Sequence, residues 1–335
     1  MIMKSDFRKW YAGRKVLITG GLGFLGSNLA HALVESGAKV TIVDALLEPY
    51  GGNIFNVDKI SDKLQIEIAD IRDTIAMKRV IPGHDLMFNL AAQVSHVDSM
   101  TEPLNDYDIN VRGNLNVLEI ARRENPNIKI VYAGTRGQYG RLKQFPVNES
   151  APRFPVDIYG TNRDAGERFH MMYGNLYGLK VTSIRINNTY GPRHQMKHGK
   201  YGILNWFIRL AMDNETIKVF GDGKQLRDYN YVDDVTDAFL MTGANEEADG
   251  ESFNLGSGNA VKFIDMAKKI IEVAGSGGYE LIPWPKERKE VEVGDYFADY
   301  GKIQKKLGWK PEVELEDGLK ATVNFYRKYR GKYWG

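Results

Sequence analysis

Cysteine is absent from this chain of 335 residues. Disulfide bonds, thiolate nucleophiles and cysteine-bound metal ions are therefore excluded from its chemistry. The sequence also lacks any apolar run long enough to span a bilayer, and its first residues do not form the apolar core of a signal peptide. We therefore expect a cytoplasmic protein that does not associate with membranes.

An excess of charge of either sign is missing as well. The chain has 45 lysines and arginines against 43 aspartates and glutamates, a formal net charge of +2. So small an excess gives no reason to expect a nucleic-acid partner. The remaining composition, 43% hydrophobic and 26% charged residues, is typical of a globular protein with one large domain or two modest ones.

Glycines gather in residues 19–26 (TGGLGFLG), between an apolar run typical of a buried strand and leucines at helical spacing. Gly20 permits a tight turn, Gly23 lets the backbone approach a pyrophosphate, and Gly26 lets the helix pack closely on the strand. The helix N-terminus would then offer unpaired N–H groups to phosphates. This pattern predicts a dinucleotide-binding turn, and the alternative is a chance glycine turn in a βαβ unit.

A carboxylate stands at the end of the second predicted strand, residues 39–43. Asp44 follows Gly26 by about 18 residues, the separation at which an acidic side chain accepts from the adenosine ribose hydroxyls. The same carboxylate would repel a 2′-phosphate. The sequence therefore favours NAD over NADP as the cofactor.

Strands and helices alternate over the first part of the chain, which indicates an α/β fold with a doubly wound parallel (Rossmann) sheet. Six strands are expected, at residues 16–18, 39–43, 64–70, 85–92, 128–133 and 181–186. Two long helices are expected at residues 103–125 and 159–177. Ligands of such sheets bind at the carboxyl ends of the strands.

Beyond Asn187 this alternation stops. We expect helices at residues 203–212, 262–273 and 317–329, a turn at 219–223 and a returning strand at 253–256. The NAD-binding Rossmann domain would comprise residues 1–187 plus about 230–260. A smaller C-terminal lobe for the substrate would comprise residues 188–229 plus about 261–335, with the substrate cleft between the two.

Further cofactor contacts are expected at strand ends. Leu90, Ala91 and Ala92 are small enough for a cofactor to lie against their backbone. The third strand is closed by Asp70, Ile71, Arg72 and Asp73, where a carboxylate could meet the adenine amine or cap the next helix. The sequence leaves these two roles open.

Three residues suggest proton transfer. Tyr159 and Arg163 are four apart at the start of a predicted helix and so share one face. A phenol acts as a base near neutral pH only if its anion is stabilised, as a fixed cation one turn away would do. Thr135, at a strand end, could donate to the same substrate oxygen. The alternative for the first two is an exposed helix pair.

Taken together, these motifs resemble the extended short-chain dehydrogenase/reductase superfamily, and in particular its nucleotide-sugar epimerase/dehydratase branch. The resemblance rests on the glycine turn, residues 89–92, Asn110, Thr135, residues 159–163, 185–192 and 227–234. It implies a tightly held NAD, a nucleotide-diphosphate sugar as substrate and a transient keto-sugar. The cofactor-binding positions are then Gly20, Gly23, Phe24, Leu25, Gly26, Asp44, Asp70, Ile71, Leu90, Ala91, Ala92, Asn110, Tyr159 and Arg163.

The same resemblance implies a set of substrate contacts. Asn188 and Arg227 would bind the diphosphate, and Arg288 or Lys289 would complete that anion clamp, because two phosphates favour several cationic donors. The alternative for Arg227 is an ion pair with a neighbouring acid, Asp228 or Asp233. The substrate-binding positions expected in total are Gln93, Thr135, Arg136, Asn188, Asn205, Arg227, Arg288 and Lys289.

Departures from the family pattern reduce the number of reactions that this protein could catalyse. Arg163 stands where the family usually has lysine; it keeps the charge but cannot give up a proton. Arg136 and Gly137 stand where the 4,6-dehydratases carry Asp-Glu, and the cysteine of the 3,5-epimerases is missing. Epimerisation through a ketone is left, with C4 favoured. Gln93 and Trp206 are similar to the branch that inverts C2 of CDP-linked sugars, so C2 stays open.

Two rival functions remain: an oxidoreductase or dehydratase that releases a keto-sugar, and a catalytically silent NAD-binding protein. His194 and His198 lie four apart in a basic loop, residues 193–200, without further ligands, so no metal is expected. That loop could cover the substrate or be merely solvated. The resemblance also implies a homodimer formed by the two long helices, whose surplus apolar residues are Val111, Leu115, Leu118, Phe169, Met172 and Leu176.

Overall fold

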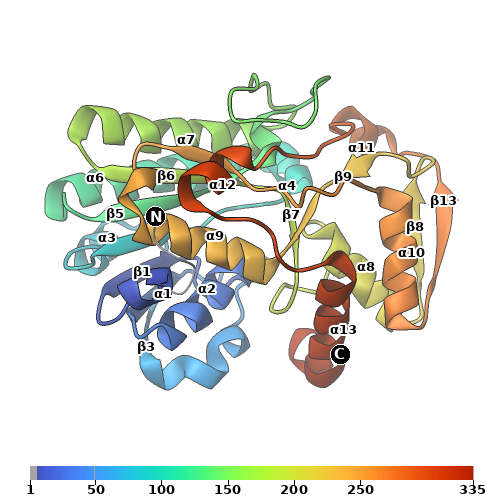
Figure 1. Ribbon diagram of the computed structural model, residues 1–335, viewed down its shortest axis with the longest axis horizontal. Coiled ribbons are helices and arrows are strands. Elements are labelled where there is room, and N and C mark those ends of the chain that lie inside the picture. Colours follow the sequence, from blue (N-terminus) through green and yellow to red (C-terminus); the bar gives the residue numbers. More distant parts are fainter. Residues whose placement is uncertain (1–5, 49, 335) are drawn as a thin grey trace.

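The computed structural model describes residues 6–48 and 50–334. Its centre is a parallel seven-stranded sheet with the strand order β11-β6-β5-β4-β1-β2-β3 (Figure 1). The strands are β1 Lys15–Thr19, β2 Lys39–Asp44, β3 Leu64–Ile68, β4 Leu86–Asn89, β5 Lys129–Thr135, β6 Lys180–Ile186 and β11 Ser252–Asn254. The predicted doubly wound α/β fold is confirmed, and the predicted returning strand completes the edge of the sheet.

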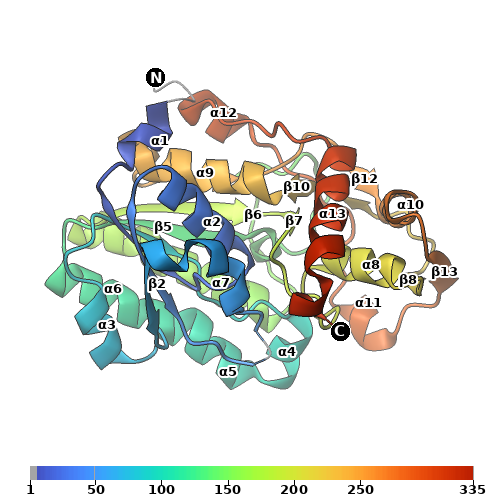
Figure 2. The ribbon, with the colours of Figure 1, turned by 90° about the horizontal axis from the view of Figure 1, so that it is seen from below.

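Helices cover both faces of this sheet, which explains why its strands are apolar throughout rather than alternating. In β1 the side chains of Val16, Leu17 and Ile18 are fully buried. One face carries α1 Asp6–Trp10, α2 Phe24–Glu35 and α9 Val232–Ala244; the other carries α3 Thr74–Val80, α6 Asn114–Glu124 and α7 Ile158–Tyr177. Figure 2 shows α2 and α9 side by side on their face.

The second lobe lies to the right in Figure 1 and has its own apolar core. It comprises α8 Ile203–Met212, β8 Thr216–Phe220, α10 Phe263–Ala274, β13 Gly278–Ile282, α11 Lys286–Glu290 and α13 Leu315–Tyr333. Short strand pairs lie between the lobes: β7 Asn188–Tyr190 with β10 Tyr229–Tyr231, and β9 Leu226–Arg227 with β12 Val261–Lys262. α12 Gly301–Leu307 is an exception to the expected division, because Ile303, Leu307 and Trp309 pack into the core beneath the sheet.

Two local predictions differ from the structure. Val219 and Phe220 were expected in a turn, but they end β8 and pair with Leu281 and Ile282 of β13; the turn begins only at Gly221. The helix expected over 103–125 is built of α5 Pro103–Tyr107, a π-helical turn at Asp108–Gly113 and α6. α4 His96–Thr101 precedes it. No helix within residues 6–48 and 50–334 is long and apolar enough to cross a membrane.

Candidate active site

Two cavities open along the carboxyl edge of the sheet and join one another. The first is bounded by the glycine turn, Asp44, Ile71 and residues 90–92. The second lies between the lobes and contains Thr135, Tyr159 and Arg163. The residues common to both are Phe24, Leu25, Leu90, Ala92, Val94, His194 and Tyr201. A long ligand can therefore extend from one cavity into the other.

The glycine turn has the geometry that a dinucleotide needs. Gly20 has a φ of +69°, which favours glycine, and its N–H donates to the Val43 carbonyl over 2.7 Å. A Cβ added to Gly26 would collide with the carbonyl oxygen of Gly20. α2 begins at Gly23 without a side-chain cap in the described structure, so its first N–H groups are available to an anion.

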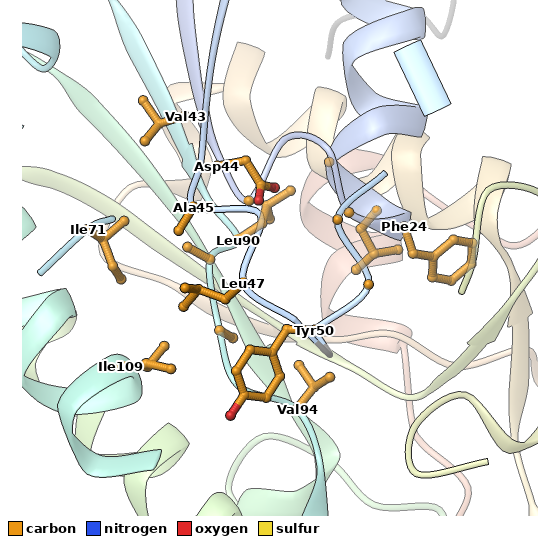
Figure 3. Close-up of a pocket in the computed structure, with 18 of the residues that line it drawn as sticks. Phe24, Val43, Asp44, Ala45, Leu47, Tyr50, Ile71, Leu90, Val94 and Ile109 are labelled. Atoms are coloured by element: carbon orange, nitrogen blue, oxygen red, sulfur yellow. The ribbon is translucent and has the colours of Figure 1, made fainter. Parts of the chain in front are cut away.

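Asp44 closes one end of the first cavity (Figure 3). Its carboxylate accepts from the backbone N–H groups of Leu22 over 3.0 Å and Leu46 over 2.9 Å, which fixes it between the glycine turn and the following loop. Burial raises the pKa of Asp44, although these two bonds oppose the rise. Tyr50, Val94 and Ile109 lie at the other end of the cavity in this view. The residues present fit the adenosine and pyrophosphate of a dinucleotide.

Asp70 also lines the first cavity, but its carboxylate is engaged by Arg72, with Nη2 at 2.6 Å and Nε at 2.9 Å. The helix cap expected of a carboxylate in this segment is present, at Asp73 rather than at Asp70. α3 begins at Thr74, and Asp73 caps it by accepting from the N–H groups of Ile75 and Ala76. The contact of Asp70 with adenine stays a prediction.

Tyr159, Arg163 and Thr135 meet in the second cavity. Tyr159 is buried, and burial raises the pKa of its phenol; the charge of Arg163 and a hydrogen bond with Thr135 lower it in turn. Arg163 donates to the Ala133 carbonyl oxygen, and its Nη1 lies 3.4 Å from Asn110 Oδ1. Its guanidinium also lies 4.6 Å from the centre of the Tyr132 ring. The exposed-pair alternative is wrong, because Arg163 is only 3% exposed.

Asn110 is fully buried in the π-helical turn and does not line either cavity. Its side-chain amide donates to the Gln93 carbonyl over 2.9 Å, while its oxygen accepts from Arg163. It therefore contacts Arg163 from behind the cavity. Its predicted contact with the cofactor stays a prediction.

The sequence reasoning missed two residues of this cavity, His96 and Asp157. Asp157 caps α7 by accepting from the Gly160 N–H over 2.7 Å, and its other oxygen pairs with His96 Nδ1. The His96 ring lies edge-on to the Tyr159 ring, with 4.8 Å between centres. A helix-capping residue two positions before Tyr159 was a readable signal for Asp157, whereas nothing in the sequence links it to His96.

The second cavity also contains four residues that were expected to bind the substrate, three of them cations. Arg136, Asn188, Arg227 and Arg288 all line it. Arg227 forms an ion pair with Glu292 and also donates to the Gly294 carbonyl. The predicted alternative partners, Asp228 and Asp233, are therefore wrong.

Gln93, Asn205 and Lys289 do not line either cavity within the described chain. Gln93 and Asn205 are buried, and their amides bond to nearby backbone groups, those of Ser95 and Gly191 respectively. Lys289 is exposed on α11, whereas Arg288 faces the cavity. The substrate contacts expected for these three stay predictions, and Arg288 is the better candidate of the anion-clamp pair.

His194 is shared by both cavities and packs edge-on against Phe24, with 4.8 Å between ring centres. Burial lowers the pKa of His194 to about 4, so its ring is neutral near pH 7. Its Nδ1 lies 2.6 Å from the Gln195 carbonyl oxygen. His194 therefore serves as an apolar, uncharged wall where the two cavities join.

Fold and site together define an α/β enzyme that binds a dinucleotide beside a polar, cation-rich substrate cavity. The model of the family described as GDP-mannose 4,6 dehydratase matches residues 17–322 of this chain. The chain belongs to that family, whose members are NAD-dependent epimerases and dehydratases of nucleotide sugars.

Curated relatives include both kinds of enzyme. A putative UDP-glucose 4-epimerase of Methanocaldococcus jannaschii is 34% identical over 316 residues, covering 93% of this chain and 98% of that protein. A dTDP-glucose 4,6-dehydratase of Shigella flexneri is 31% identical and covers 93% of this chain and 92% of its own length. Family membership is thus clear, while the reaction has to be argued from the site.

Solved structures agree with the fold over nearly the whole chain. An epimerase of Methanothermobacter thermautotrophicus superposes with a TM-score of 0.92 at 28% identity, covering 98% of this chain and 96% of that one. The UDP-glucose 4-epimerase of Thermotoga maritima, solved with UDP-glucose, gives 0.85 at 35% identity, with 94% and 99% covered. That of Thermus thermophilus, solved with NAD, gives 0.83 at 30% identity, with 93% and 99% covered.

Proposed function

We propose that this protein is an NAD-dependent epimerase of a nucleotide-diphosphate sugar, with inversion at C4 favoured over C2. The observation that supports it best is the meeting of Tyr159, Thr135 and Arg163 in the second cavity, which joins the first. The catalytic, cofactor-binding and substrate-binding roles given to individual residues belong to this proposal. So do the cytoplasmic location and the homodimeric state.

The proposed chemistry begins at a sugar hydroxyl. When bound, NAD would accept the hydride from the carbon that carries this hydroxyl and would later give it back. Tyr159 takes the hydroxyl proton, and Thr135 donates a hydrogen bond to the same oxygen. Arg163 stabilises the phenolate by its charge. If the hydride came back to the opposite face of the ketone, Tyr159 would return the proton to the oxygen, and the epimer would form without net redox change.

Elimination of water is disfavoured by the residues after Thr135. An elimination needs a base for the carbon-bound proton and an acid for the departing hydroxyl. Arg136 cannot serve as either, because its guanidinium does not lose a proton in proteins, and Gly137 has no side chain. Simple epimerisation requires neither group. The dehydratase therefore ranks second among the enzymatic candidates.

Incubation of the purified protein with UDP-, GDP-, CDP- and dTDP-sugars tests the proposal. We expect one substrate to equilibrate with its epimer, seen by chromatography, without accumulation of NADH measured by absorbance. Release of a keto-sugar, with or without loss of water, would support the oxidoreductase or the dehydratase instead. Binding of NAD without turnover of any sugar would indicate the silent protein.

A further inference from the structure

Arg136 is a cation in the second cavity without a carboxylate partner in the described parts of the chain. It follows Thr135 directly and begins a short 3₁₀ turn, Arg136–Gln138. Its Nη2 lies 3.3 Å from Asn188 Oδ1, and its guanidinium lies 5.3 Å from the centre of the Tyr296 ring. These contacts use one donor and one face of a group that has five N–H donors.

The charges around Arg136 do not balance. The acids that line the cavity are Asp157 and Glu292, and each already has a partner, His96 and Arg227 respectively. Burial and the nearby charge of Arg227 lower the pKa of Arg136, and the charge of Glu292 opposes this lowering without cancelling it, which marks an unfavourable site for a cation. A guanidinium nevertheless stays charged in a protein, so it needs an anion from a ligand.

Position along the cavity indicates which part of the ligand this anion belongs to. Thr135, the preceding residue, shares a hydrogen bond with Tyr159, so the reacting carbon lies at that end. Arg227 and Arg288, the cations expected at the diphosphate, line the same cavity, and the charge of Arg227 acts on Arg136. The Arg136 backbone adjoins the reacting centre, and its side chain reaches toward Asn188 and Arg227. In a nucleotide sugar the sugar ring connects the reacting carbon to the diphosphate, so a side chain between these two groups would face the ring.

We propose that the sugar of the substrate carries a carboxylate, as a uronic acid does, and that Arg136 binds it. The inference rests on the function proposed above and adds the substrate class. A planar guanidinium with free donors matches a carboxylate by two parallel hydrogen bonds. Asn188 contacts the edge of the Arg136 guanidinium and Tyr296 contacts its face, and these two contacts orient it. A neutral sugar would leave this cation unpaired, so the cavity discriminates against it.

The test compares UDP-glucose with UDP-glucuronate, which differ only in the oxidation state of C6, and uses UDP alone to isolate the diphosphate. Affinities are measured by calorimetry on the NAD-loaded full chain, and turnover on both sugars is measured in parallel. We expect the uronate to bind about 10- to 100-fold more tightly than the neutral sugar, the range that a hydrogen-bonded charge contributes. Arg136→Gln should abolish this preference, and Arg136→Lys should retain part of it.

Arg288→Gln is the matched comparison, because it should weaken UDP and both sugars by the same factor. Equal or tighter binding of UDP-glucose by the wild type would overturn the proposal. The proposal would also be overturned if Arg136→Gln lost the same factor of affinity for UDP, for UDP-glucose and for UDP-glucuronate. Arg136 would then belong to the diphosphate clamp. The ratio of the wild-type affinities for UDP-glucuronate and UDP-glucose decides the question even if Arg136→Gln fails to fold. A protein that prefers the uronate without turning it over would refute the epimerase function alone.

Discussion

Asp157 and His96 are joined by a hydrogen bond beside the ring of Tyr159, while the same carboxylate caps the helix that carries that tyrosine. The Asp157 side chain is 3% exposed, whereas that of His96 is 42% exposed and lines the cavity. One carboxylate thus fixes the start of α7 and orients an imidazole at the substrate. Its negative charge also raises the pKa of Tyr159.

The two roles of Asp157 can be separated by substitution. Asp157→Ser keeps an N-cap acceptor and removes the charge, whereas Asp157→Ala removes both. We expect Asp157→Ala to lower the free energy of unfolding by about 1 kcal/mol more than Asp157→Ser, the usual value of a cap. Thermal unfolding measures this difference. Equal stability of the two variants would show that the cap contributes little.

The charge of Asp157 also predicts a pH dependence of stability. Burial favours the neutral acid, but the bonds from His96 and Gly160 outweigh it, so the folded-state pKa of Asp157 is lowered. A carboxyl whose pKa is lower in the folded state stabilises the fold at pH values above its unfolded-state pKa of about 3.9. This stabilisation is lost as the pH falls through the folded-state pKa. The stability difference between wild type and Asp157→Ser should therefore shrink below about pH 4. A difference that grew toward acid pH would contradict this sign.

Catalysis should depend on Tyr159 far more than cofactor binding does. Tyr159→Phe should lower turnover by about 10²–10⁴-fold, the usual contribution of a general acid–base, and leave NAD affinity nearly unchanged. Thr135→Val removes one hydrogen bond and should cost less. Steady-state kinetics and NAD titration measure the two quantities. Wild-type turnover in Tyr159→Phe would place the proton transfer on another residue.

Arg163 should control the pH at which the enzyme works. The phenol acts as a base only when ionised, so activity rises with pH through its pKa. Arg163 lowers that pKa, and its removal in Arg163→Met should therefore move the rising limb of the rate profile to higher pH. Arg163→Lys keeps a charge and should keep measurable activity. An unchanged profile in Arg163→Met would mean that this charge does not act on Tyr159.

Cofactor choice is expected to depend on Asp44. Its half-buried carboxylate would face the 2′-phosphate of NADP without a counter-ion, so NAD should bind more tightly by several kcal/mol. Asp44→Ser should narrow the difference between the two dissociation constants. Gly26→Ala should weaken both cofactors, because its Cβ collides with Gly20, whereas Gly278→Ala, with open space around it, is the matched control. Similar wild-type affinities for NAD and NADP would refute the role of Asp44.

Dimerisation is testable on α5 and α7, which pack against each other. Of the apolar residues expected to mediate it, Val111 and Leu118 are buried within the chain, and Leu176 is 67% exposed. Leu104 on α5 is 78% exposed. We expect a dimer by light scattering, and a monomer after Leu176→Glu or Leu104→Glu. Leu281→Glu, in the other lobe, is the control and should stay dimeric. A wild-type protein that is monomeric at micromolar concentration would contradict the predicted dimer.

The sequence predicted what depends on short-range chemistry. A strand, a glycine turn and a helix lie within a few residues of one another, so residues 16–35 could be assigned at once, and Asp44 followed from the next strand. The turn expected at 219–223 failed because two glycines outweighed the pairing of Val219 with a strand far along the chain. Pairing partners at such separation leave no local signal.

Side-chain pairs that close the site were out of reach for the same reason. His96 is separated from Asp157 by 61 residues, and Arg227 from Glu292 by 65. Each acid has nearer cations along the chain, and only the folded backbone selects among them. The sequence could therefore identify Arg227 as a cation of the site without identifying what neutralises it.

The position of β11 at the edge of the sheet has a consequence for biosynthesis. β11 and α9, which complete the edge and cover one face, are translated after α8 and β8 of the other lobe. A nascent chain that ends near Asn187 has the open edge of β6 and lacks Phe239, which packs on Phe88. Folding of the first lobe must wait for the ribosome to release part of the second. The first lobe is therefore not a continuous stretch of the chain, and a fragment that ends near Asn187 would lack part of its sheet and core.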